Sequence, residues 1–249
     1  MRYLLTVSYL GKNYCGSQKQ PHKNTIQDKL EEALCTLIQQ NISTIFSGRT
    51  NTGVNALGQT LHIDLDKEIE PKRFIYGLNH LLPEDIIVTD IKKAASGFHA
   101  QMSAKYRHYQ YLIRNTLTPC VFDTRAFHTR QELDVKRLNQ ALELIIGEHD
   151  FSAFKSSSDN PAKVCSIYLA KAVRDEEYIK IDIVGDRFLY NMVRTIVGTL
   201  LEIEKEDCKP AKMSEILNSK DRTQAGPTAD ACGLTLIKVG YEPYIQKIK

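Results

Sequence analysis

The sequence predicts an α+β fold in which a β-α-β-β-α-β unit occurs twice along 249 residues. Three observations support this prediction. Segments that alternate apolar and polar residues indicate strands, segments with apolar residues three and four apart indicate helices, and the order of both in the first half repeats in the second. Because no low-complexity tract or Pro-rich linker separates the halves, we expect them to pack as one body.

The first half is expected to open with a strand at residues 2–10. Thr25 and Asp28 then resemble a capping box, which predicts a helix with an apolar face formed by Ile26, Leu30, Leu34, Leu37 and Ile38. A short strand is expected at 43–47, a helix from Pro71 through Phe74, Leu78 and Leu81, and a closing strand at 85–91.

The strand at 60–66 shows the clearest alternation in the first half. Its pattern predicts that Leu61, Ile63 and Leu65 point inward. The intervening side chains are expected to point outward, and these are Thr60, His62 and Asp64.

The second half is expected to repeat this order after a boundary near residues 96–103. Strands are predicted at 106–114, 164–173, 178–184 and 234–241, and helices at 134–146, 189–204 and, as a short addition, about 212–218. This order predicts tandem ferredoxin-like units, at 1–98 and 99–249, whose two antiparallel sheets lie side by side with helices on one face and a central cleft where the halves face each other.

Composition predicts an ordinary cytoplasmic protein with a real core, since 42% of the residues are hydrophobic and 25% are charged. No apolar run approaches the ~20 residues that span a bilayer, and the start of the chain is too quickly polar for a secretory signal. Six cysteines stand singly, which favours buried free thiols. Seven scattered histidines form no pair four residues apart, so no metal site is expected.

The net charge of +3 is too small to indicate nucleic-acid binding, but its distribution is uneven. Residues 99–130 contain five basic residues against Asp123 alone, and the aromatic residues Tyr106, Tyr109, Tyr111, Phe122 and Phe127 lie among them. Such a stretch fits an RNA groove, where basic groups neutralise phosphate and rings stack on bases. It fits equally an edge strand with a solvated basic face.

Residues 48–59 form the most informative segment, because three glycines among polar residues predict a tight loop. Such a loop can present a carboxylate as a nucleophile or base, but Asn51 stands at that point. The segment resembles the signature of the bacterial tRNA pseudouridine synthase A family, Gly-Arg-Thr-Asp-x-Gly-Val-His-Ala-x-Gly-Gln. Asn51 replaces the family's catalytic Asp, and Asn55 replaces its His.

The resemblance extends over nearly the whole chain. Residues 8–20 are similar to the family's Tyr-x-Gly-x-x-Tyr-x-Gly-Trp-Gln-x-Gln, with Ser17 in place of Trp. Residues 186–194 resemble its Phe-Leu-x-x-Met-Val-Arg block, and residues 220–223, 228–229 and 233–234 resemble its C-terminal block.

The resemblance implies a protein that isomerises uridine to pseudouridine in the anticodon arm of tRNA, with no metal or organic cofactor. It places Asn51 at the catalytic position, with Arg194 as partner of the missing carboxylate, Arg49 toward phosphate and Tyr109 stacked on the target base. It also implies a homodimer without membrane attachment. The residues it assigns to RNA contact are Phe98, His99, Ala100, Gln101, Met102, Arg107, Ser158, Asp159, Asn160, Pro161 and Ala162.

Other interpretations of the same residues stay open. Tyr109 fits a core tyrosine, Arg194 fits a pair with any surface acid, and residues 156–160 fit an ordinary surface loop. A carboxamide neither titrates near neutrality nor forms the adduct of a carboxylate. Three functions therefore remain: an RNA-modifying isomerase, an RNA-binding relative with little or no activity, and a protein scaffold without an RNA role.

Overall fold

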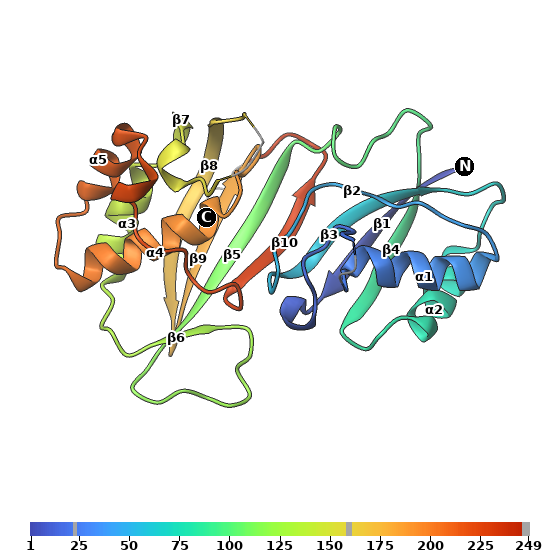
Figure 1. Ribbon diagram of the computed structural model, residues 1–249, viewed down its shortest axis with the longest axis horizontal. Coiled ribbons are helices and arrows are strands. Elements are labelled where there is room, and N and C mark those ends of the chain that lie inside the picture. Colours follow the sequence, from blue (N-terminus) through green and yellow to red (C-terminus); the bar gives the residue numbers. More distant parts are fainter. Residues whose placement is uncertain (22–23, 158–160, 246–249) are drawn as a thin grey trace. The chain divides into compact units, whose positions relative to one another are not determined.

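The computed structural model describes residues 1–21, 24–157 and 161–245 (Figure 1). The chain divides into two compact units. The first comprises Met1–Lys105 with Thr235–Glu242, and the second comprises Tyr106–Leu234 with Pro243–Lys249. Within the described residues, no helix is both long enough and apolar enough to cross a lipid bilayer.

The first unit is a sheet in the order β4-β1-β3-β10 with two packed helices. Its central strand β1 (Arg2–Tyr9) is antiparallel to β3 (Asn55–Asp64) and β4 (Ile86–Ala94), and the short β2 (Ile45–Phe46) pairs with β3. Alternate residues of β1 are buried, as its apolar pattern predicts.

The two helices of this unit begin where the sequence predicts. In α1 (Ile26–Ile38), the Thr25 hydroxyl accepts the Asp28 N–H, which confirms the N-terminal cap. In α2 (Pro71–Leu81), Pro71 occupies the first turn and the Glu70 side chain caps it. The helices pack against one another, and α2 packs against β4 (Figure 1). Leu81, the last apolar residue of α2, is exposed, and the next residue, Leu82, is buried.

The expectation that Thr60 and His62 point outward into solvent is wrong. Both are buried, because other parts of the first unit cover their face of β3. The Thr60 and Tyr241 hydroxyls are 2.6 Å apart, and the Ala100 N–H donates to His62 Nδ1 at 3.1 Å. β3 also begins at Asn55, inside the segment expected to be loop.

The strand β10 (Leu234–Gly240) returns from the far end of the chain to pair in parallel with β3. Thr235 lies opposite Asn55, and Leu236 opposite Ala56. The order of elements along the sequence did not predict this pairing.

The second unit is an antiparallel sheet in the order β5-β9-β8-β7, with the short β6 parallel to β5. The strands are β5 (Tyr106–Asn115), β6 (Phe127–Thr129), β7 (Gly147–Asp150), β8 (Val164–Asp175) and β9 (Tyr178–Gly185). The short β6 and β7 were not predicted. The α+β class and the successive strand-helix units are confirmed.

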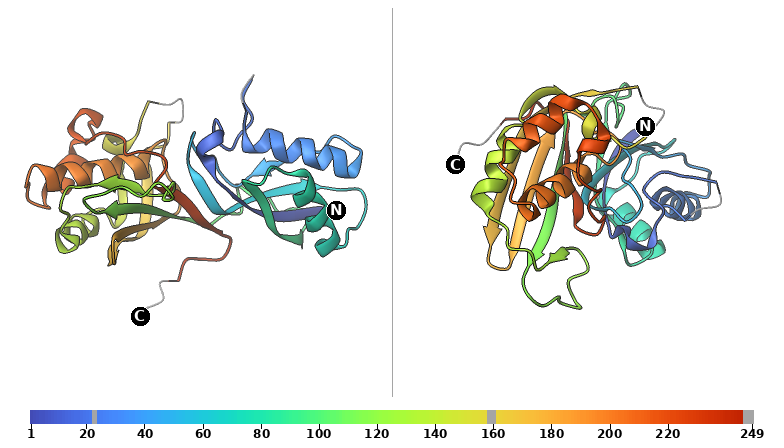
Figure 2. Two further views of the ribbon diagram at one scale, coloured as in Figure 1. Left: turned by 90° about the horizontal axis from the view of Figure 1, so that it is seen from below. Right: turned by 60° about the vertical axis from the view of Figure 1, so that its left-hand side comes forward.

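Among the described residues of the second unit, the helices are α3 (Val135–Glu143), α4 (Met192–Lys205) and α5 (Lys212–Ser219), and they pack against one another (Figure 2). α4 is buried on most sides, and it starts three residues later than expected because Asn191 adopts φ 61° at its N-cap. All six cysteines are free thiols, although only Cys165 is fully buried.

Candidate active site

The segment between β2 and β3 makes a tight turn that presents Asn51. The Val54 N–H donates to the Asn51 carbonyl oxygen at 3.1 Å, and Gly53 adopts φ 78°, a conformation that favours glycine. Asn51 is half-buried and Thr52 is exposed. The turn therefore places residue 51 at the surface of the first unit.

Thr50, the residue before Asn51, is buried and held from two sides. Its N–H donates to the Ser17 hydroxyl at 2.9 Å, and its carbonyl oxygen accepts the Ser17 N–H at 3.1 Å. Its own hydroxyl lies 2.7 Å from the Tyr9 hydroxyl. The backbone that leads into residue 51 is thus fixed by β1 and by the segment before α1.

Tyr9 acts here as a neutral hydrogen-bonding partner. Burial raises the pKa of Tyr9 to about 12, although hydrogen bonds from Thr50, Gln59 and Ser17 oppose the shift. Its hydroxyl stays protonated at physiological pH and is no candidate for a general base.

Buried polar side chains also hold the other parts of the segment 48–59 by hydrogen bonds. Asn55 Oδ1 accepts the Gly11 N–H at 2.9 Å. The Gln59 amide donates to the Gly48 carbonyl oxygen at 3.1 Å and accepts the Ser47 hydroxyl at 2.8 Å. Asn55 and Ser17, at which the chain departs from the motifs that it resembles, therefore both make hydrogen bonds that hold the turn.

Arg49 contrasts with its neighbours because it is exposed. It makes no hydrogen bond or ion pair with any residue in the described ranges 1–21, 24–157 and 161–245. Its guanidinium is therefore available for an anion in solution.

In the second unit, Tyr109 lies half-buried on β5, opposite Ile183 of β9. The Phe188 ring is perpendicular to the Tyr109 ring, with 5.2 Å between centroids. On the same strand, Arg107 Nη1 donates to the Asp186 carbonyl oxygen at 2.8 Å. The edge contact with Phe188 sets the orientation of the tyrosine ring.

Arg194 lies in the first turn of α4 and is held by neutral acceptors. Its Nε donates to the Ala229 carbonyl oxygen at 2.7 Å, and its Nη1 donates to Asn191 Oδ1 at 3.2 Å. Within the described part of the chain, Arg194 forms no salt bridge with a carboxylate. Its charge still helps to lower the pKa of Asp230, which is lowered mainly by the Cys232 N–H.

The segment 98–102 is held against the rest of the first unit by backbone hydrogen bonds and by contacts between aromatic rings. Phe98 lies against Tyr241 with 4.9 Å between centroids, and the Ala100 carbonyl oxygen accepts the Tyr241 hydroxyl. His99 Nδ1 accepts the N–H groups of Gln101 and Met102, each at 3.2 Å. These last two residues are exposed, so the anchored segment displays them to solvent.

The other predicted contact segment is only partly described. Pro161 is exposed and Ala162 is half-buried, whereas the predicted residues Ser158, Asp159 and Asn160 lie outside the described residues. Within the described ranges, no group of three or more His, Cys, Asp or Glu side chains is placed to hold a metal ion.

Sequence reasoning missed the residues that hold the turn, namely Tyr9, Ser17, Thr50 and Gln59. The alternation in β1, which puts Tyr9 on the same face as the buried Leu5 and Val7, is a signal that Tyr9 is inside. For Ser17 no local signal exists, because its partner lies 33 residues away in sequence.

Comparison with known proteins identifies the family. A family model described as tRNA pseudouridine synthase matches residues 5–102 and 141–242. The chain is 40% identical over 247 residues to tRNA pseudouridine synthase A of Ehrlichia canis (strain Jake), covering 97% of this chain and 100% of the relative. It is 37% identical over 246 residues to the protein of that name in Francisella tularensis subsp. novicida (strain U112), covering 97% and 95%.

The chain belongs to the tRNA pseudouridine synthase family. The ranges that match the tRNA pseudouridine synthase model contain the turn with Asn51 and the helix start with Arg194, whereas Tyr109 lies between them. A solved structure titled "Crystal Structure of a Cbf5-Nop10-Gar1 Complex" is 9% identical with a TM-score of 0.42, covering 94% of this chain and 49% of that one. That similarity is too low to add to the assignment.

We expect Tyr9→Phe to lower the free energy of unfolding by about 1 kcal/mol at pH 7, because Thr50 loses a buried partner. Since the folded pKa of Tyr9 is raised to about 12, its contribution is complete below pH 10 and is lost as the pH rises toward 12. Urea denaturation from pH 7 to 11 should show the gap between parent and variant shrinking. Tyr76→Phe, at an exposed site, is the control; equal stability of all three proteins at pH 7 contradicts the assigned contact.

Proposed function

We propose that this chain is a tRNA-binding pseudouridine synthase that presents residue 51 to a uridine in the anticodon arm of tRNA. The observation that carries the proposal is the turn at residues 51–54, whose backbone is fixed by buried hydrogen bonds on both sides. A reacting group in such a turn needs no reorganisation when substrate binds. The family supplies the reaction class.

The proposed reaction is an isomerisation without any group added or lost. The bond between uracil nitrogen and ribose carbon breaks, the base turns, and a ring carbon bonds to the same ribose carbon. That ring carbon loses its proton, and the freed nitrogen gains one. In this scheme Arg49 contacts phosphate, Tyr109 stacks on the base, and Arg194 stabilises negative charge at residue 51.

Asn51 limits this chemistry. A carboxamide carries no anionic oxygen, and it neither accepts the proton nor forms the adduct available to a carboxylate. We therefore propose that the chain as it stands reacts slowly, because residue 51 lacks a carboxylate. A tRNA-binding relative without activity is the second candidate, and Asn51 is the observation that favours it.

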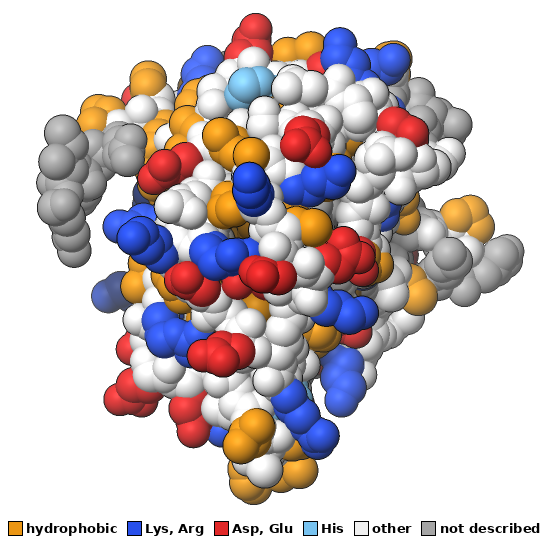
Figure 3. Space-filling view, turned by 90° about the vertical axis from the view of Figure 1, so that its left-hand side faces the viewer, with side chains coloured by type: hydrophobic (Ala, Val, Ile, Leu, Met, Phe, Trp, Pro, Cys, Tyr) orange, Lys and Arg blue, Asp and Glu red, His pale blue; other side chains and the backbone are white. Residues whose placement is uncertain are grey.

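The proposed RNA contacts are Arg49, Arg107 and the segments 98–102 and 158–162. Figure 3 looks onto the side of the second unit where α3 and α5 lie, and there Lys and Arg side chains alternate with Asp and Glu. A face of mixed charge has little net attraction for a polyanion. The exposed guanidinium of Arg49 and the exposed residues Gln101 and Met102 are better suited to contact RNA than this face of mixed charge.

We further propose a cytoplasmic homodimer in which one tRNA contacts both subunits. The loop between β5 and β6 extends beyond the ends of these strands (Figure 1). Three of its apolar side chains are exposed. Leu117, Val121 and Phe122 are 79%, 87% and 91% exposed. Apolar side chains gathered on one loop fit a protein interface better than open solvent.

We expect Asn51→Asp to raise the rate of pseudouridine formation in unmodified tRNA by at least about 100-fold, because it supplies the missing carboxylate. Asn and Asp have nearly the same shape, so the turn has no reason to move. Asn51→Ala is the matched control and should not exceed the parent. If the Asp variant is no faster than the parent, the proposed role of residue 51 is wrong.

Binding is tested separately from chemistry by gel-shift titration of tRNA at several salt concentrations. We expect the logarithm of the association constant to fall linearly with the logarithm of the salt concentration, with a slope of about −0.7 to −0.9 for each phosphate that the protein neutralises. Arg49→Ala should make the slope shallower by about 1, whereas Arg73→Ala, an exposed arginine on α2, should not. No binding even at low salt would eliminate both RNA functions.

A thermodynamic cycle tests the proposed pairing of Arg194 with residue 51. Arg194→Ala loses its bonds to Ala229 and Asn191 in any background, so this loss cancels. We expect Arg194→Ala to destabilise the Asn51→Asp protein by at least about 1 kcal/mol more than the parent, because it leaves the new carboxylate unpaired. Equal losses in denaturation experiments would mean that the two residues do not interact.

A further inference from the structure

We infer that Ser17 and Asn55 are positioning residues, which fix the backbone on the two sides of residue 51 and thereby set the rate of the proposed reaction. This inference rests on the proposed function. It concerns the two positions, besides 51, at which the chain departs from the motifs that it otherwise resembles. Both departures place a small polar side chain in the interior.

Ser17 acts on the upstream side. It is fully buried and makes two hydrogen bonds to Thr50, one from its own N–H and one to its hydroxyl. Tryptophan, which the family pattern has here, offers only an N–H donor and does not accept the Thr50 N–H. In this chain the turn therefore depends on an acceptor that the usual residue lacks.

Ser17 is itself held by the start of α1. The Ile26 N–H donates to the Gly16 carbonyl oxygen at 3.3 Å, and the Gln27 N–H donates to the Ser17 carbonyl oxygen at 3.0 Å. These are first-turn N–H groups without partners inside the helix. The helix thus supports the backbone that supports Thr50.

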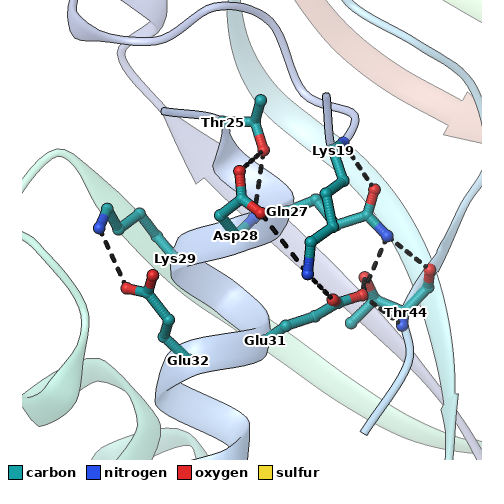
Figure 4. Close-up of polar contacts among 8 residues, drawn as sticks. All are labelled: Lys19, Thr25, Gln27, Asp28, Lys29, Glu31, Glu32 and Thr44. Atoms are coloured by element: carbon teal, nitrogen blue, oxygen red, sulfur yellow. Dashed lines mark hydrogen bonds and ion pairs between the residues drawn. The ribbon is translucent and has the colours of Figure 1, made fainter. Parts of the chain in front are cut away.

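Residues farther along α1 also hold the chain just before β2, the strand that precedes the turn (Figure 4). Gln27 accepts the Lys19 N–H at 2.9 Å and donates to the Thr44 carbonyl oxygen at 3.1 Å. Glu31 accepts both the N–H and the hydroxyl of Thr44 at 2.9 Å, and it lies 3.3 Å from the Lys19 ammonium. One helix face therefore fixes both Ser17 and the chain entering β2.

Asn55 acts on the downstream side. Its Oδ1 accepts the Gly11 N–H at 2.9 Å, which joins the end of the turn to the segment after β1. The approach is close: a Cβ on Gly11 would stand 2.2 Å from the Val54 carbonyl oxygen. The Val54 N–H in turn donates to the Asn51 carbonyl oxygen. The contact of Asn55 with Gly11 is therefore linked to residue 51 through Val54.

The kinetic test uses the Asn51→Asp protein as the reference. We expect Ser17→Ala or Asn55→Ala added to it to lower kcat on the order of 10- to 100-fold while KM for tRNA stays within twofold, since the RNA contacts lie elsewhere. Asn55→His, which retains a ring nitrogen as acceptor, should keep most of the activity.

Asn79→Ala is the matched control for a merely structural effect. Asn79 Oδ1 accepts the Val88 N–H at 2.8 Å and its amide donates to the Val88 carbonyl oxygen at 2.9 Å, between α2 and β4. Its loss should lower the melting temperature as Ser17→Ala does, yet leave kcat unchanged.

Amide hydrogen exchange by NMR tests the positioning without any catalysis. In the parent protein, Ser17→Ala should speed exchange of the Thr50 amide at least tenfold, and Asn55→Ala that of the Gly11 amide, with β8 amides unchanged. Unchanged exchange, or an unchanged kcat, overturns the inference. If the Asn51→Asp protein forms no pseudouridine, the proposed function fails, and the exchange rates alone decide whether Ser17 and Asn55 hold the turn.

Discussion

The pairing of Thr50 with Ser17 is the contact on which the arrangement of the site depends. Both backbone groups of Thr50 are inside the first unit, where an unpaired N–H or carbonyl costs about 1–3 kcal/mol. Satisfying them requires that the segment before α1 lies directly against the turn. The buried hydroxyl of Thr50 likewise requires that Tyr9 of β1 lies within hydrogen-bonding distance. A strand, a helix start and a turn are thereby fixed in place around residue 51.

This arrangement explains how the site keeps its form with an amide at its centre. None of the hydrogen bonds described for the turn requires a carboxylate, because Thr50, Asn55 and Gln59 supply its contacts. In the second unit, Arg194 donates to Ala229 and Asn191, so its guanidinium has partners of its own. Charge at position 51 is thus a chemical requirement of the proposed reaction and is separate from the requirements of folding.

Sequence predicted the elements that local physics determines and missed those that depend on distant contacts. The Thr25 cap and the strand β1 are local features, and both were predicted. Alternation did not reveal that His62 is covered, because that follows from Ala100 far along the chain. β6 and β7 are too short to show a period. Positions 17 and 55 could be identified from the sequence as departures from the family motifs, but their hydrogen-bonding partners could not.

β3 connects the two parts of the first unit to which function is assigned. Its first residue, Asn55, ends the turn, and Gln59 ties the start of the turn to the strand interior. Farther along, His62 Nδ1 accepts the Ala100 N–H, and burial is the main cause that lowers the pKa of His62, which keeps the ring a neutral acceptor. The proposed catalytic turn and the proposed RNA segment 98–102 are therefore attached to one strand. A displacement of β3 would therefore move both segments. The polar face of β3 is as buried as its apolar face, and the hydrogen bonds made there hold the strand in place.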